Sequence, residues 1–73
     1  MPIFSDRMKE KRLEKQWSQR HAAREYGCTL VQWQRWEGGT IVPRVDNAVQ
    51  IARVLGVSLD YLTGLSDREE IEK

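Results

Sequence analysis

The chain has 73 residues, enough for one small domain and too few for two, because a second domain would need about 50 residues or more of its own. Hydrophobic residues make up 40% of it, so it can form a thin core but cannot enclose a large pocket, which excludes most enzymes. Twelve basic and eleven acidic side chains nearly cancel, but nine of the basic groups and only five of the acidic ones lie in residues 1–44. A polyanion, if one binds, is therefore expected to meet the N-terminal part.

The first predicted element is a helix over residues 6–16. Ser5 is its expected N-cap, because a serine side chain accepts hydrogen bonds from the unpaired N–H groups of a first helical turn. Phe4, Met8 and Arg12 follow one another at intervals of four and therefore share one face, which we expect to be directed into the core. The position of Arg12 on this face predicts a half-buried side chain.

The next two elements are helices over residues 19–26 and 30–37. Ser18 and Thr29 are their expected N-caps, and Gly27 ends the earlier helix because glycine tolerates the left-handed conformation found there. The connection between the two helices is only two or three residues long. So short a connection forces a sharp crossing and predicts a helix-turn-helix.

The remaining elements are a helix over residues 45–55, which ends at Gly56, and a short helix over residues 59–63, which has Ser58 as its N-cap. The only run of β-branched residues ends at a proline, so no strand is predicted. Residues 65–73 are acidic and weakly patterned, and we expect either a frayed tail or a helix that needs a partner. The predicted fold is all-α, a compact five-helix bundle that contains a helix-turn-helix.

A set of residues in this order and spacing resembles a known family. They are Ser18-Gln19, Ala23, Gly27, Trp36-Glu37, Gly39, Pro43, Ile51-Ala52, Leu55-Gly56-Val57-Ser58-Leu59 and Leu62. The family is the lambda-repressor-like, Cro-type (Xre) helix-turn-helix family, and the resemblance runs from about residue 8 to residue 64. It implies a helix-turn-helix DNA-binding domain over residues 1–64, followed by an acidic C-terminal tail over residues 65–73.

The predicted helix over residues 30–37 has a core side, with Trp33 and Trp36, and a solvent side. The solvent side carries Leu30, Val31, Gln32, Gln34 and Arg35. These residue types suit a major groove, because glutamine pairs with adenine, arginine pairs with guanine and aliphatic groups contact thymine methyls. The resemblance assigns base reading to Leu30, Val31, Gln32 and Arg35.

The resemblance also assigns contacts with the DNA backbone and one ion pair. The backbone contacts fall on Ser18, Gln19, Thr40 and Arg44. The ion pair joins Arg12 to Glu37 and bridges the first helix to the end of the third; the alternative is two ordinary surface charges, which would stabilise little. Arg20 and Arg24, one turn apart, either contact phosphates or form a solvated face.

Several positions depart from the family pattern, including Trp33, which stands where an aliphatic residue is usual. Lys11 and Ala22 stand where larger apolar residues are usual, and we expect Trp33 to fill the space that Ala22 leaves. Arg44 replaces a helix-capping serine, so the fourth helix should begin weakly. Thr40 and the isoleucine after it replace basic loop residues, which should weaken non-specific DNA binding.

Other features have structural interpretations. The three tryptophans are expected in the core rather than on a base-stacking surface, Cys28 as a buried thiol, and His21 in a solvated pair with Glu25. One histidine and one cysteine cannot supply a metal site, and no glycine-rich phosphate loop opens a helix. We therefore expect no catalytic residue, metal, cofactor or small-molecule ligand.

With no apolar segment of membrane-spanning length and no signal-peptide pattern, we expect a cytoplasmic protein without a membrane partner.

These observations predict a sequence-specific, double-stranded-DNA-binding transcriptional regulator, a phage or bacterial repressor that binds a two-fold operator as a homodimer. The expected dimer contact is formed by Val57, Leu59, Tyr61 and Leu65. One alternative is the antitoxin of a toxin–antitoxin pair, which would use residues 65–73 to bind the toxin. Another is a protein-interaction module that has lost DNA binding.

Overall fold

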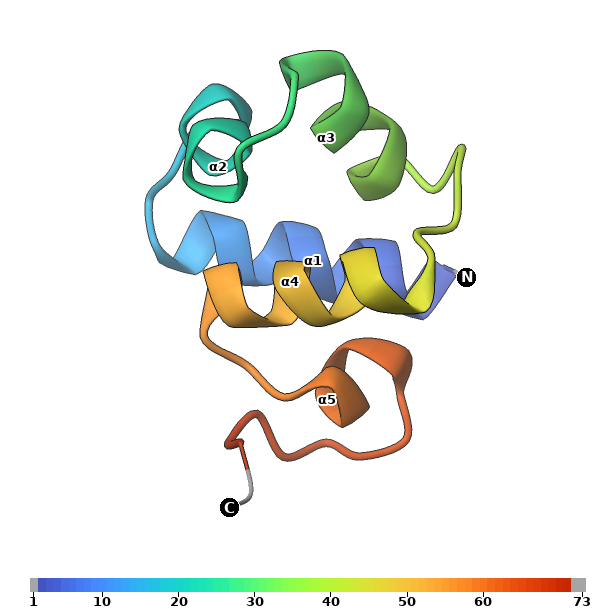
Figure 1. Ribbon diagram of the computed structural model, residues 1–73. Coiled ribbons are helices and arrows are strands. Elements are labelled where there is room, and N and C mark those ends of the chain that lie inside the picture. The colour runs from blue at the N-terminus through green and yellow to red at the C-terminus, as the bar shows by residue number, and fades with distance from the viewer. Residues whose placement is uncertain (1, 72–73) are drawn as a thin grey trace.

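Five helices make up most of the computed structural model, which describes residues 2–71 (Figure 1). They are α1 (Pro2–Glu14), α2 (Gln19–Tyr26), α3 (Leu30–Glu37), α4 (Val45–Leu55) and α5 (Leu59–Thr63). No strand occurs in the described residues, and none of their helices is long and apolar enough to cross a membrane. The predicted all-α bundle is confirmed, and the predicted bounds of α2 to α5 are correct.

The predicted bounds of α1 are wrong at both ends. The helix begins at Pro2 rather than at Asp6, so Ser5 lies inside it as a buried residue and is not its N-cap. Proline suits a first helical turn because its φ is preset and it has no N–H to leave unpaired. The four added residues bring Phe4 into the core. At the other end Gln16 has a φ of 61°, a left-handed conformation that a right-handed helix cannot include.

The later helices begin as their capping residues predict. Ser18, Thr29 and Ser58 each accept a hydrogen bond at 3.0–3.1 Å from the backbone N–H three residues further on. Arg44, as predicted, gives α4 no side-chain cap. Asp46 lies in the first turn of α4, where its negative charge favours the positive end of the helix dipole.

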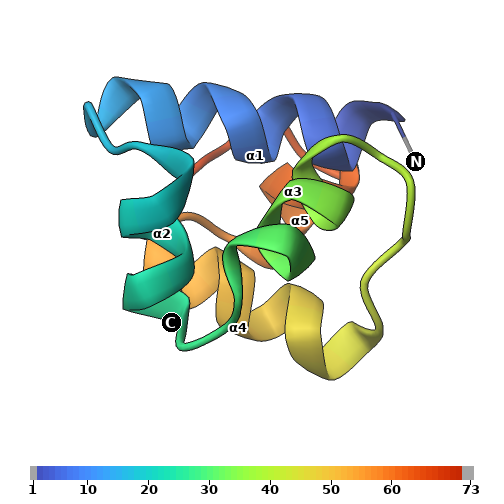
Figure 2. The same cartoon turned by 90° about the horizontal axis from the view of Figure 1, so that it is seen from above.

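The core lies between α1, α4 and the α2–α3 pair, and α5 closes it from the other side (Figures 1 and 2). Its buried hydrophobic side chains are Phe4, Met8, Ala22, Ala23, Trp33, Trp36, Ala48, Ile51, Ala52, Leu55, Val57, Tyr61 and Leu62. Trp33 and Trp36 are in the core as predicted, and the ring of Tyr26 meets that of Trp36 edge-on at 5.1 Å. Trp17 is only half-buried and packs against the edge of the core.

Residues 65–71 form neither a frayed tail nor a helix. This segment, which we call the C-terminal strap, passes below α5 in the view of Figure 1, and its side chains Asp67 and Glu69 contact α1. The backbone N–H of Ser58 donates to the carbonyl of Glu69 at 2.8 Å, and the Ser58 hydroxyl donates to the carbonyl of Arg68 at 3.0 Å. Sequence patterning missed these bonds because backbone pairing between distant segments leaves no local signal.

The strap also explains the unusual lysine in α1. The side chain of Lys11 is 5% exposed, and its ammonium group lies 2.6 Å from Glu69 and 3.0 Å from Glu14. Arg7 contacts Asp67 at 2.8 Å in the same way, and both cations lie over the ring of Tyr61. An apolar side chain at position 11 would pack against Tyr61 but could not hold the strap.

Candidate functional site

The turn between α2 and α3 is as tight as its sequence predicts. Gly27 has a φ of 93°, and the N–H groups of Gly27 and Cys28 both donate to the carbonyl of Ala23, at 2.8 and 3.0 Å. The chain then enters α3 after Thr29. The two helices lie at the same end of the molecule and run in different directions (Figures 1 and 2).

The structure divides α3 into an anchored side and an exposed side. Trp33, Trp36 and Glu37 are buried. Val31 and Arg35 are exposed, as expected for base-reading positions, and a spacing of four places them on one face of the helix. Leu30 and Gln32 were expected to be solvent-exposed, but both are half-buried. They lie in the first turn of α3, close to the tight connection with α2.

The residues assigned to the DNA backbone fall into two groups. Ser18 and Gln19 lie at the start of α2, and the hydroxyl oxygen of Ser18 is used in capping. Thr40 and Arg44 are exposed and belong to the segment between α3 and α4. The backbone N–H of Thr40 donates to the carbonyl of Arg35 at 3.0 Å, which ties the start of this segment to α3.

Arg12 and Glu37 form a bidentate ion pair across the core. Arg12 Nε donates to Glu37 Oε2 and Arg12 Nη2 donates to Glu37 Oε1, both at 2.8 Å. Their side chains are 8% and 2% exposed, so this is a buried pair and not two surface charges. Arg12 Nη1 also donates to the carbonyl of Trp17 at 2.7 Å, which connects the pair to the loop before α2.

Glu37 accepts two further hydrogen bonds that the sequence analysis missed. Trp33 Nε1 donates to its Oε2 at 2.7 Å, and Gln19 Nε2 donates to its Oε1 at 3.2 Å. Burial alone would raise the pKa of Glu37, but the hydrogen bonds from Arg12, Trp33 and Gln19, together with the charge of Arg12, outweigh it and the pKa is lowered. The bond from Trp33 could have been predicted, because residues four apart lie on the same face of a helix. The bond from Gln19 of α2 could not, because no sequence pattern relates the two residues.

Basic side chains differ in pairing between α1 and the helix-turn-helix. Three of the four basic side chains of α1 have acidic partners, namely Arg7, Lys11 and Arg12. Four exposed arginines around α2 and α3 form no ion pair within residues 2–71: Arg20, Arg24, Arg35 and Arg44. Their charge is therefore not offset by a contacting carboxylate and is accessible to an anion.

The other chemically active side chains near α2 are in structural contacts. His21 stacks on Trp17 with ring centroids 4.8 Å apart, and its Nε2 lies 3.4 Å from Glu25, as the predicted solvated pair requires. Cys28 is half-buried against the core, and this burial raises the pKa of its thiol. Among residues 2–71 no cluster of three or more His, Cys, Asp or Glu side chains could hold a metal ion.

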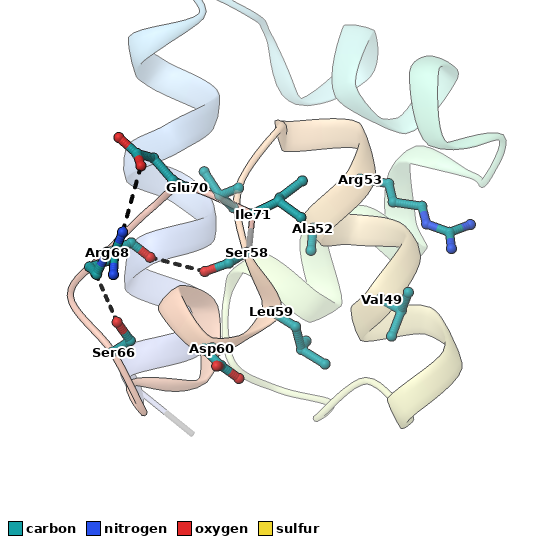
Figure 3. Close-up of a pocket in the computed structure, with 11 residues that line it drawn as sticks. Val49, Ala52, Arg53, Ser58, Leu59, Asp60, Ser66, Arg68, Glu70 and Ile71 are labelled. Carbon is teal, nitrogen blue, oxygen red and sulfur yellow. Dashed lines mark hydrogen bonds and ion pairs between the residues drawn. The ribbon is translucent and has the colours of Figure 1, made fainter. Parts of the chain in front are cut away.

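The predicted dimer surface needs correction. Val57 and Tyr61 are 4% and 6% exposed, because both pack into the core of their own chain. Leu65 is exposed and Leu59 is half-buried. Leu59 lines a surface groove between α4, α5 and the strap, which we call the α4–α5 groove (Figure 3). Its apolar lining is Val49, Ala52, Val57, Leu59 and Ile71, and Arg53, Asp60, Arg68 and Glu70 add charges of both signs.

Comparison with known proteins finds one family. Residues 8–62 match a family model described as helix-turn-helix. The matched range begins in α1 and ends in α5, so it includes the whole α2–α3 pair and leaves out the strap. No curated protein and no solved structure matches the chain.

Proposed function

Because the chain belongs to the lambda-repressor-like (Xre) helix-turn-helix family, we propose that it is a sequence-specific transcriptional regulator that reads duplex DNA with α3. One observation carries the proposal: the side of α3 with Trp33, Trp36 and Glu37 is buried, while Val31 and Arg35 are exposed and Arg35 forms no ion pair within residues 2–71. A helix that inserts into a major groove needs one face packed against the rest of the protein and the opposite face free to contact bases, and α3 has both.

The proposed base-reading residues have distinct roles. Arg35 pairs with guanine O6 and N7, because its guanidinium group carries parallel donors. Val31 and Leu30 contact thymine methyl groups, and the amide of Gln32 pairs with adenine. The half-burial of Leu30 and Gln32 supports contacts at the edge of the groove for these two, with Val31 and Arg35 at the centre.

Backbone contacts position the domain without specifying sequence. We assign them to Ser18, Gln19, Thr40 and Arg44, which flank α3 at the start of α2 and in the segment before α4. The start of α2 also offers unpaired backbone N–H groups to a phosphate. Arg20 and Arg24 of α2, which form no ion pair within residues 2–71, add to the positive potential beside the DNA-binding face of α3.

The proposed regulator is a repressor that binds a two-fold operator as a homodimer, in the cytoplasm of a bacterium or of a phage-infected cell. In such complexes the half-sites lie about 34–36 Å apart, so that both copies face the same side of the duplex. The α4–α5 groove with Leu65 supplies the contact between copies. A rim that carries both Arg53 and Asp60 suits a two-fold contact, because each can meet the other in the partner copy.

The experiment is selection of duplexes from a random pool by the full chain, followed by footprinting of the selected site. We expect a site with two symmetrical halves, bound more weakly as salt concentration rises. Failure to select any duplex would favour the protein-interaction module instead. The antitoxin alternative is supported by no observation, since residues 65–71, most of its proposed toxin-binding segment, are engaged with α1 and α5.

A further inference from the structure

A chain of hydrogen bonds leads from the buried ion pair to the surface of the helix-turn-helix. Gln34 Nε2 donates to Gln19 Oε1 at 3.1 Å, and Gln19 Nε2 donates to Glu37 Oε1 at 3.2 Å. Glu37 is buried, Gln19 is half-buried and Gln34 is exposed, so the chain runs outward from α3 to α2 and back to α3.

The carboxylate at the inner end fixes the orientation of both amides. Glu37 is ionised in this site because Arg12 binds both of its oxygens, and an ionised carboxylate only accepts hydrogen bonds. Gln19 must therefore direct its NH₂ group toward Glu37 and its oxygen toward Gln34. Gln34 in turn must direct its NH₂ group toward Gln19. Amide orientation in proteins is set by such networks, and here the network has one solution.

This orientation leaves a defined group on Gln19. Its NH₂ group has two N–H donors, one bonded to Glu37 and the other without an acceptor in residues 2–71. A phosphate oxygen only accepts hydrogen bonds, so it requires a donor at this place. Without Gln34 and Glu37 the amide of Gln19 could rotate and offer its oxygen instead, or lose binding energy to the ordering of a free side chain.

We propose that Gln34 is a positioning residue, which together with Glu37 holds the amide of Gln19 with one N–H available to a DNA phosphate. The inference rests on the proposed function and adds to it a residue that reads no base. Gln34 lies on the same helix as the proposed readers, but its amide is directed to α2 by its bond to Gln19.

The test is a double-mutant cycle in DNA affinity with the full chain. Gln34→Met removes the donor to Gln19 and keeps a side chain of similar length; Gln19→Met removes the phosphate contact itself. We expect Gln34→Met to weaken binding to the selected operator and to a scrambled duplex alike, by about three- to tenfold. In the Gln19→Met background the same change should have almost no effect.

Gln50 supplies the matched control, because it is exposed on α4 and its side chain makes no hydrogen bond within residues 2–71. Gln50→Met should leave the affinity for both duplexes unchanged. Gln34→Met and Gln50→Met should melt within a degree or two of the wild type, whereas Gln19→Met, which loses its hydrogen bond to Glu37, should melt a few degrees lower. A second measurement needs no DNA: Gln34→Met should shift the side-chain amide signals of Gln19 in the nuclear magnetic resonance spectrum of the free protein.

The outcomes separate this inference from the function on which it rests. If the wild type binds no duplex, the proposed function fails and the inference fails with it. If the wild type binds but Gln34→Met binds equally well, only the inference is overturned. A loss that persists in the Gln19→Met background, or that is confined to one base pair, also overturns it, because Gln34 would then touch DNA itself.

Discussion

Glu37 is the residue on which the helix-turn-helix depends for its position. Four donors from Arg12, Trp33 and Gln19 converge on its carboxylate, and they come from α1, α2 and α3 itself. A carboxylate in an apolar core is costly unless its oxygens are satisfied, and here both are. The pair thus fixes the end of α3 against α1, and removing either member leaves a buried charge without a partner.

The first prediction concerns stability. Glu37→Ala should lower the free energy of unfolding by about 3–5 kcal/mol, because it leaves Arg12 buried and unpaired. Glu25→Ala is the control, since Glu25 forms an exposed pair with His21 that should be worth about 0–1 kcal/mol. Melting temperatures of the two variants would measure the difference. Equal values would mean that the buried pair contributes no more than a surface one.

The second prediction concerns how the stability of the fold depends on pH in the acidic range. The pKa of Glu37 is lowered in the folded chain from its ordinary value of 4.5, so the folded state holds this proton less tightly than the unfolded state does. Its contribution to stability is therefore complete above pH 4.5 and is lost as the pH falls through the folded pKa. Melting curves of the wild type and of Glu37→Gln between pH 6 and pH 2 should approach one another in acid. A constant gap would contradict the assignment.

At the scale of elements, capping residues were the most informative part of the sequence. Serine or threonine before α2, α3 and α5, with glycine after α2, α3, α4 and α5, placed every end of these four helices except the uncapped start of α4, because these preferences act within one turn. The same reasoning failed for α1, where Ser5 resembles a cap but packs against the core. The prediction that Val57 and Tyr61 are exposed for a dimer contact also failed, because a five-residue helix and the loop before it do not reveal which side their neighbours cover.

The candidate site was foreseeable only in part. Its residues on α3 followed from helical periodicity and from resemblance, and the exposure of Val31 and Arg35 agrees with it. The hydrogen bonds of Gln19 were not foreseeable. They join side chains from two helices, and their existence depends on a crossing geometry that no local pattern encodes.

The third prediction belongs to α3. Gln32→Ala should leave the fold intact and reduce binding to the operator by about 1–3 kcal/mol, with the loss concentrated at one or two base pairs in each half-site. Gln50→Ala on α4 is the matched control. Affinities for the operator, for single-base variants of it and for scrambled duplex would measure this. An equal loss of affinity for all duplexes would mean that Gln32 contacts the sugar-phosphate backbone of the DNA and not a base.

At the scale of the molecule, the strap connects the C-terminal end of the described chain to α1 at its N-terminal end. Lys11 and Arg7 of α1 contact Glu69 and Asp67, and Ser58 bonds to the backbone of the same segment. Burial alone would lower the pKa of Lys11, but its contacts with Glu69 and Glu14 prevail and raise it. The contribution of Lys11 is thus complete below pH 10.5 and is lost as the pH rises through the folded pKa.

The fourth prediction tests the strap. Glu69→Gln should lower the free energy of unfolding by about 1 kcal/mol, a modest figure because Glu69 is half exposed. In a Lys11→Met background the same change should have no effect. Glu70→Gln is the control, since Glu70 is exposed and, among residues 2–71, forms an ion pair only with Arg68, at 3.9 Å. Urea titrations would measure all four variants, and equal losses in both backgrounds would show that Lys11 and Glu69 are not coupled.

The contact between α1 and the strap also has a consequence for the order of folding. Arg7 and Asp67 are 60 residues apart, whereas α2 and α3 are joined through a turn of a few residues. Bringing together segments so far apart costs more loop-closure entropy than joining near neighbours. We therefore expect folding to begin in the local α2–α3 unit and to end with the closure of the strap. Unfolding should follow the reverse order of events. Backbone amide protons of the strap should therefore exchange with solvent well before those of α3.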